Sequence, residues 1–347
     1  MRIVVDIPEE MVGQIRTAVD QGGYDDPEEF LRRALNTQLE LERGEEKSLP
    51  SFSEAIGGGR SVTQSEFEHG RAKSETHGNS GRSQEDLSIR DFQVSIVDPP
   101  DEERTTGGPL WGQYNRVFPM KFSARRLAIV LDNSNSNLTP YDEFRSDTAE
   151  VARTYGFRLA EADDANGRPR GEKVSAGFPT GDKVDRSKER FMTHFVGQID
   201  SSGNLTGSLP NLGFANIDPN ERGFGLTDAG LKFARLENPL LDEDIHADSS
   251  LSAEERDFYI DHVSKQLPGE YSAMRVAAEA IDEGVDRPQP LSERIGELSD
   301  DWSEAQASTI RSGMIGRMVE LELVSRHRVG SRGVGYDLTQ LGEEELL

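Results

Sequence analysis

The residues best suited to chemistry in this sequence are arginines gathered around glycines near the C-terminus. The stretch SRHRVGSRGVGYDLT at 325–339 contains Arg326, Arg328 and Arg332, with His327 between the first two. Guanidinium groups hold phosphate through paired, charge-assisted hydrogen bonds. The glycines lie between two strand-like segments, which favours a hairpin turn over a phosphate-binding loop that opens a helix. We therefore expect a hairpin whose arginines either contact a nucleic-acid backbone or pair with acidic surface residues.

A second basic segment lies earlier in the chain. Between Arg104 and Leu131 there are five basic residues and no acidic one, and aromatic residues are interleaved with them. This combination is typical of nucleic-acid binding. The residues of this segment that we expect to contact DNA are Arg116, Lys121, Arg125 and Arg126, together with Arg311 and Arg317, which precede the C-terminal hairpin.

Residue patterns of catalysis and of metal binding are missing from the sequence. There is no cysteine, which excludes disulfides and thiolate-ligated zinc. The six histidines are scattered, and none pairs with another at metal-ligand spacing. Neither a GxxxxGK[ST] phosphate loop nor a GxSxG nucleophile elbow occurs. We therefore expect no enzyme activity, no catalytic residue, no cofactor and no metal site.

The overall charge is strongly acidic. The chain has 39 Lys+Arg against 64 Asp+Glu, a formal net charge of -25, and lysine is the minority among its basic residues. This composition resembles that of proteins from extreme halophiles, whose carboxylate-rich surfaces stay hydrated in molar salt. Local basic patches are then more informative about partners than the net charge is. No apolar window is long enough for a membrane span and no signal-peptide core is present, so we expect a cytoplasmic protein without a membrane partner.

Residues 1–45 have the pattern of a small strand–helix–helix unit. Apolar and polar residues alternate over RIVVDI at 2–7, and Pro8 suits the start of a helix. Gly22-Gly23 ends that helix, and Pro27 lies in the first turn of a second one. A unit of this size is too small to bury a core alone, which indicates that it pairs with another chain.

This pattern resembles the ribbon-helix-helix family (CopG/Arc/MetJ-like), in which two chains pair their strands into a ribbon that enters the DNA major groove. The resemblance implies a homodimer, or a pair with a smaller ribbon-helix-helix chain. It implies that the dimer core contains Ile3, Val5 and Ile7, and that the DNA-facing side contains Arg2, Val4 and Asp6. Acidic residues outnumber basic ones over 1–45, so a unit that only dimerises is the alternative.

Residues 46–108 are rich in Ser, Gly, Glu and Arg, and only DFQVSIV at 91–97 alternates regularly. Such a composition buries too little apolar surface to offset the entropy of ordering the chain. We expect a disordered linker here.

Residues 250–347 have the order of a winged helix-turn-helix domain. Ser252 and Glu255 form a capping box at the start of one helix, and further helices are expected over about 271–283, 290–298 and 303–321. LELVSRHRV and GYDLT then give two strands joined by GSRG, and a short helix follows Thr339. Helices followed by a hairpin resemble the winged-helix family, in which the helix before the hairpin enters the major groove and the hairpin forms the wing.

Residues 109–240 repeat part of this pattern. RGFGLTDAG at 222–230 resembles RGVGYDLTQLG at 332–342, and in both we expect Leu-Thr to close a strand and the Thr to cap a helix. One or two helices are expected within 138–162, and a strand is expected over FMTHFVGQI at 191–199. The segment is therefore a candidate second winged-helix-like domain, with an insertion at about 163–190.

Together these patterns predict a mainly α protein with small β elements: a ribbon-helix-helix dimerisation domain, a disordered linker, and one or two winged helix-turn-helix domains. The predicted function is a sequence-specific transcriptional regulator that binds double-stranded DNA as a dimer. The layout resembles the long ribbon-helix-helix regulators linked to cell-division genes in haloarchaea. The alternative is a protein-interaction scaffold, or an antitoxin-like partner, that uses the ribbon-helix-helix for dimerisation.

Overall fold

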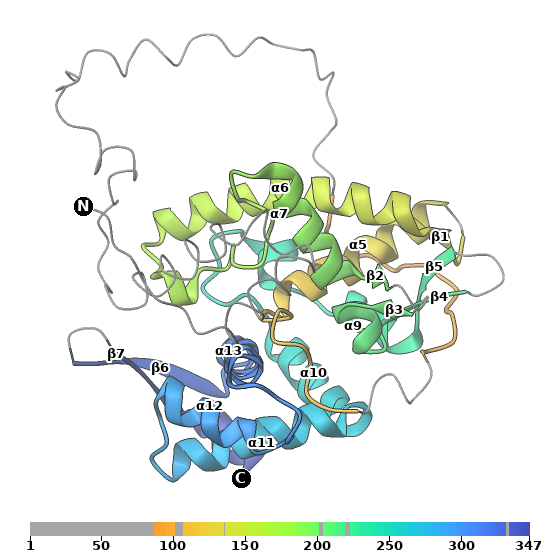
Figure 1. Cartoon of the computed structure of the whole chain (residues 1–347). Helices are drawn as coiled ribbons and strands as arrows, with labels where there is room; N and C mark the ends of the chain where they lie inside the picture. The colour runs from red at the N-terminus through yellow and green to blue at the C-terminus, as the bar shows by residue number, and fades with distance from the viewer. Residues whose placement is uncertain (1–85, 101–106, 135, 201–203, 219–222, 331–332) are drawn as a thin grey trace, which may run out of the picture. The chain divides into compact units, whose positions relative to one another are not determined.

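A computed structural model of the chain describes residues 86–100, 107–134, 136–200, 204–218, 223–330 and 333–347 (Figure 1). Helix accounts for 56% of these residues and strand for 10%, so the prediction of a mainly α fold with small β elements is confirmed. The predicted ribbon-helix-helix and most of the predicted linker lie outside the described residues. One compact unit comprises Gln84–His327 and Val334–Leu347.

The segment from 118 to 243 begins with two long helices, α5 (Phe118–Ser134) and α6 (Tyr141–Ala165). A single helix over 141–165 confirms the helix expected within 138–162. The remaining elements are short: β1 (Thr139–Pro140) between α5 and α6, then η1 (Arg170–Glu172), α7 (Val184–Phe191), η2 (Met192–Val196), β2 (Gln198–Ile199), β3 (Leu205–Thr206), α8 (Ser208–Asn211), β4 (Ala215–Ile217), β5 (Gly223–Leu226), α9 (Asp228–Arg235) and η3 (Pro239–Glu243).

Three of these strands form one antiparallel sheet in the order β1-β5-β4. Phe224 of β5 lies opposite Thr139 on one side and opposite Ile217 on the other. The N–H of Val97, at the end of the alternating DFQVSIV segment, donates to the carbonyl of Leu226 at 2.8 Å. β5 therefore connects segments that are far apart in the sequence.

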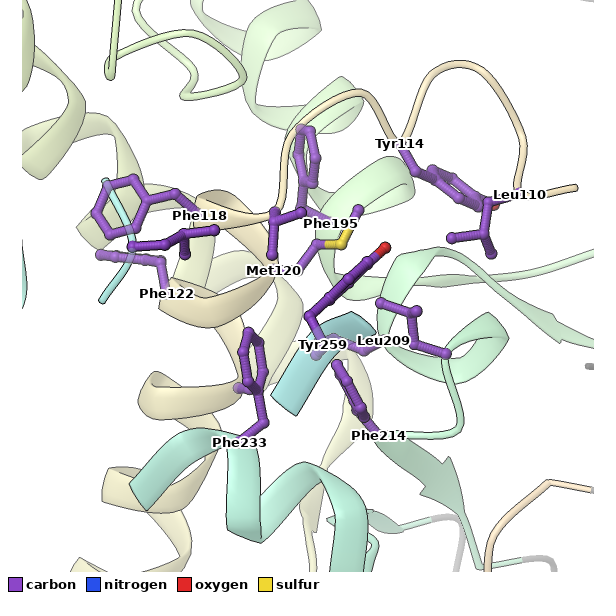
Figure 2. Packing of buried hydrophobic residues seen from close by; sticks show 14 of the residues in the cluster. Leu110, Tyr114, Phe118, Met120, Phe122, Phe195, Leu209, Phe214, Phe233 and Tyr259 are labelled. Atoms are coloured by element: carbon purple, nitrogen blue, oxygen red, sulfur yellow. The ribbon is translucent and has the colours of Figure 1, made fainter. Parts of the chain in front are cut away.

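Helix α5 is buried along most of its length and forms the centre of the core. Phe118 and Phe122, one turn apart, both contact Phe178, with ring centroids 5.4 and 5.2 Å away. Figure 2 shows these two α5 rings on one side of the start of the helix and Tyr259, from a later helix, on the other. A helix buried on several faces has to carry apolar side chains around most of its circumference.

The segment from 253 onward follows the predicted order of helices, hairpin and helix. Its elements are α10 (Ala253–Gln266), α11 (Pro268–Asp282), α12 (Pro288–Gly296), α13 (Glu304–Glu320), β6 (Val324–Val329), β7 (Gly333–Leu338) and α14 (Gln340–Leu346) (Figure 1). The capping box expected at Ser252 and Glu255 is present at the start of α10. The N–H of Tyr336 in β7 donates to the carbonyl of Asp286 at 3.0 Å, which ties the turn before α12 to the hairpin.

The Leu-Thr pairs predicted to close a strand and cap a helix do so in both places. Thr227 follows β5 and caps α9, where its hydroxyl accepts the N–H of Gly230 at 3.1 Å. Thr339 follows β7 and caps α14, where its hydroxyl accepts the N–H of Gly342 at 3.0 Å. The repeated sequence therefore encodes a repeated structure.

The turns that lead into the two hairpins also match. The Thr227 hydroxyl donates to the carbonyl of Gly213 at 2.6 Å, and the Thr339 hydroxyl donates to that of Glu322 at 2.5 Å. Both acceptor residues have a left-handed backbone, with φ of 68° and 60°. Glu322 adopts this conformation without being glycine, which costs free energy that the surrounding hydrogen bonds have to offset.

The strand predicted over 191–199 is wrong for most of its length. Met192–Val196 form a π-helical turn that continues α7, and only Gln198–Ile199 is a strand. Phe191 and Phe195 are both buried, at the four-residue spacing of a helix. The pattern of apolar residues in FMTHFV at 191–196 fits both a helical and a strand period, so the sequence alone did not distinguish a helix from a strand here.

Candidate nucleic-acid interface

Two of the basic residues expected to contact DNA are buried on α5. Lys121 and Arg125 are 0% exposed. The Lys121 Nζ lies 2.8 Å from Glu255 Oε1, and the Arg125 Nη1 lies 2.7 Å from Asp242 Oδ1. Arg126 is buried too. Buried charges are stable only when paired, and these pairs tie α5 to η3 and α10. The structure thus corrects the expectation for all three residues, because a DNA phosphate cannot reach them in this arrangement.

Burial has different effects on the pKa values of the two ion pairs. Burial lowers the pKa of Lys121 to about 8, although the charge of Glu255 opposes that shift. Burial likewise raises the pKa of Glu255. For Asp242, burial acts to raise the pKa, but the paired hydrogen bonds and charge of Arg125 outweigh it and the pKa is lowered. The Arg125–Asp242 pair is bidentate, and its two hydrogen bonds therefore compensate for burial better than the Lys121–Glu255 pair does.

Arg317 on α13 is also fully buried, which corrects its expected role at a DNA surface. Its Nη2 lies 2.6 Å from Glu270 Oε1 on α11, and its Nη1 donates to the carbonyl of Tyr114 at 2.5 Å. The other carboxylate oxygen of Glu270 accepts the N–H of Leu110 at 2.7 Å. The pair therefore joins α13 and α11 to the segment Leu110–Val117.

This segment covers one face of α13. A Cβ added at Gly313 would lie 2.2 Å from the carbonyl oxygen of Gly112, and one added at Gly316 would lie 2.7 Å from that of Asn115. Such close backbone contact requires glycine. Gly313 and Gly316 share a helix face that points away from Met318, which packs in the core. The second half of α13 is therefore closed to an outside partner on this face.

The first half of α13 remains accessible. Glu304, Ala305 and Gln306 are exposed, as is Ser312 further along. None of these four side chains is basic. In this structure the helix before the hairpin thus presents a short, polar surface rather than a row of cations.

Two other basic residues expected to contact DNA share one acceptor, and the charge of a third acts on one of them. Arg116 and Arg326 both donate to the carbonyl of Gly171, at 3.0 and 2.7 Å. Arg311 lies near enough for its charge to act on Arg326. All three side chains are half-buried. Arg116 also donates to the carbonyl of Gly316, so this cluster joins the segment before α5 to α13 and β6. Neither charge nor spacing in the sequence indicated that Arg116 and Arg326 would meet.

The hairpin β6–β7 carries the remaining expected residues. Arg328 is exposed. His327 Nδ1 lies 2.6 Å from Asp337 and its Nε2 lies 3.7 Å from Asp286, so acidic neighbours face the histidine on both ring nitrogens. Arg332 lies outside the described residues, as do the expected ribbon residues Arg2, Val4 and Asp6 and the expected dimer-core residues Ile3, Val5 and Ile7.

Other features that could hold a ligand are modest. A pocket of about 410 Å³ lies between α9 and α10, where Phe258 and His262 form part of its wall and Lys232 and Lys265 are among the lining residues. Among the described residues, no group of His, Asp and Glu could hold a metal ion. No helix in that same part of the chain is long and apolar enough to cross a bilayer.

No protein-family model matches this chain, no curated protein matches it, and no solved structure matches its fold.

Proposed function

We propose that this chain is a DNA-binding transcriptional regulator that acts as a dimer through residues 1–45. The observation that carries the proposal is the repeated topology of the helical unit. In the first copy α5, β1, α6 and α8 precede the hairpin β4–β5, with η1, α7, η2 and the paired strands β2 and β3 inserted between α6 and α8, and the sheet order is β1-β5-β4. Helix, short strand, helices and hairpin in this order are typical of winged helix-turn-helix domains.

The second copy supports the same interpretation. There α11, the residues around Asp286, α12 and α13 precede the hairpin β6–β7. The threonine caps at Thr227 and Thr339 lie at equivalent positions after the two hairpins. The expected domains at 109–240 and 250–347 are proposed on this basis as two winged helices within one compact unit.

In the proposed regulator, base contacts and backbone contacts are made by different parts of the chain. Because the second half of α13 is covered, we assign base contacts to the ribbon at 1–45 and backbone contacts to the wing and the half-buried arginines. The proposed target genes are cell-division genes of a halophilic archaeon. That part rests only on the resemblance of residues 1–45 and on the acidic composition.

A salt-dependent gel-shift assay with duplex DNA tests the proposal. Arg328→Ala should weaken binding to every sequence by a similar factor and reduce the slope of log K against log salt by about 1, because one phosphate contact is lost. Arg2→Ala should instead change the preference among sequences. Lys265→Ala, which removes a charge that is 65% exposed on α10, is the control and should bind as the wild-type protein does. A wild-type chain that binds no duplex at any salt concentration rules the proposal out.

A protein-interaction scaffold, or an antitoxin-like partner, is the second candidate function. It is favoured by the covered face of α13 and by the burial of Lys121, Arg125 and Arg317 in ion pairs. A pull-down with and without nuclease treatment separates the two. A scaffold keeps its partners after nuclease treatment, whereas a regulator loses a specific DNA fragment.

A further inference from the structure

We infer that Arg116, Arg311 and Arg326 together form a binding site for a phosphate group. The link of this site to DNA rests on the proposed function, but the site itself does not. Arg116 lies far from Arg311 and Arg326 in the sequence, and the fold brings it to the same carbonyl as Arg326.

The geometry places two of the guanidinium groups on one acceptor. The Arg116 Nη2 and the Arg326 Nη1 donate to the same carbonyl oxygen, that of Gly171. These nitrogens therefore lie within two hydrogen-bond lengths of each other. The Arg116 Nη1 also donates to the carbonyl of Gly316 at 3.2 Å, which fixes the guanidinium plane beside α13.

In the described part of the chain, no carboxylate forms a direct ion pair with the cluster, although the buried Glu320, which accepts the N–H groups of Val117 and Phe118, interacts with the charge of Arg116. Among the described residues, no carboxylate lies within ion-pair distance of Arg116, Arg311 or Arg326. Arg317 and Arg125, by contrast, each have a carboxylate partner. In a chain with 64 acidic residues, many carboxylates were available to neutralise these three arginines as well.

Like charges held together in a half-buried place destabilise one another. The pKa of Arg326 is lowered first by burial and next by the charge of Arg116, and Arg311 adds to this effect. Glu172 and Tyr336 act in the opposite direction without pairing with Arg326. An anion that joined the cluster would relieve this repulsion.

The available donors suit a phosphate group. Each guanidinium has five N–H donors. Arg311 uses its Nε and Nη2 on the hydroxyls of Ser292 and Ser308, which leaves its Nη1 for another acceptor. Arginine forks match phosphate oxygens in geometry and charge, and three of them surround an anion better than a single side chain does. The phosphate can come from the DNA backbone or from a free phosphate compound, and the experiment distinguishes these sources.

The test measures the melting temperature of the full chain with inorganic pyrophosphate at constant ionic strength. At ten times the dissociation constant, pyrophosphate should raise the Tm of the wild-type chain by about 3 °C. Arg326→Gln and Arg311→Gln should abolish this rise. Arg311 bonds only two serine hydroxyls, so its variant should fold even if Arg326→Gln does not. The matched control is Arg158→Gln, because Arg158 is a half-buried arginine on α6 that lies over the Tyr155 ring.

The outcomes separate the site from the proposed function. If duplex DNA cancels the pyrophosphate effect, the backbone phosphate is the ligand. If pyrophosphate binds but DNA does not compete, the site takes a free phosphate compound. A wild-type chain that is stabilised by pyrophosphate yet binds no DNA keeps the site and refutes the regulator. Equal Tm shifts in the wild-type chain and in Arg311→Gln, or no shift in the wild-type chain, overturn the inference.

Discussion

Arg317 and Glu270 form an ion pair in which neither side chain is exposed, with 2.6 Å between Nη2 and Oε1. The pair links the helix before the C-terminal hairpin to α11, and backbone groups of Tyr114 and Leu110 take up further hydrogen bonds of both partners. Arg317, on the helix expected to read DNA, thus stabilises the packing of α13 against its neighbours.

Glu270→Gln should destabilise the fold strongly. The substitution leaves the Arg317 guanidinium buried without a counterion, which costs about 3–5 kcal/mol. Chemical denaturation of the full chain measures this loss. The matched control is Asp261→Asn, because the Asp261–Lys265 pair on α10 is exposed at 61% and 65% and its loss should cost less than about 1 kcal/mol. Similar losses in the two variants would contradict a structural role for the buried pair.

Gly313→Ala should lower the stability of the chain although alanine is the better helix former. Its Cβ would lie 2.2 Å from the Gly112 carbonyl oxygen, so the covering segment has to shift, at a cost of about 2 kcal/mol. The same substitution at Gly296, in α12, is the control, because its Cβ would meet only the Ala307 side chain at 3.5 Å. There we expect unchanged or slightly higher stability. Thermal denaturation of both variants distinguishes the positions, and a neutral Gly313→Ala would show that Leu110–Val117 does not rest on α13.

His194 should make the fold sensitive to acid. Burial, and then the charge of Arg190, lowers the pKa of His194 to about 4, from an ordinary value of 6.5. Below pH 6.5 the unfolded chain therefore binds the proton more readily than the folded chain does. The stability that depends on neutral His194 is complete above pH 6.5 and is lost as the pH falls toward 4.

The variant His194→Gln measures this contribution. Between pH 7 and pH 5 the free energy of unfolding, measured by chemical denaturation, should fall by about 2 kcal/mol less in the variant than in the wild-type chain. His246→Gln is the control, because His246 is exposed, and its pH profile should follow that of the wild-type chain. Parallel profiles for His194→Gln and the wild-type chain would refute the prediction. Carboxylate titration affects all three proteins alike and drops out of the comparison.

Local elements were predictable because their causes lie close together in the sequence. The capping box of Ser252 with Glu255 involves residues three apart, and the order of α10 to α14 followed from apolar spacing. The threonine caps at Thr227 and Thr339 followed from a short repeat. The strand expected at 191–199 failed because a short apolar run fits both helical and strand periods.

The candidate site was predicted less well, because charge partners cannot be read from neighbours in the sequence. The run from Arg104 to Leu131 contains no acidic residue, which suggested an open basic surface. Its carboxylate partners are Asp242 and Glu255, more than a hundred positions later. Arg116 and Arg326 were expected to contact DNA as separate residues, and only the fold shows that both donate to the carbonyl of Gly171.

The sequence by itself determined the helical class of the protein, the C-terminal hairpin, both threonine caps, and the absence of cysteine chemistry, since each depends on composition or on residues a few positions apart. Only the tertiary structure decided which cations are exposed. It buried Lys121, Arg125 and Arg317 against distant carboxylates. It brought Arg116 and Arg326 to one carbonyl, with no carboxylate within ion-pair distance of either in the described part of the chain. The physical reason is that the energy of a charge depends on its surroundings in space, which chain packing sets and local sequence does not.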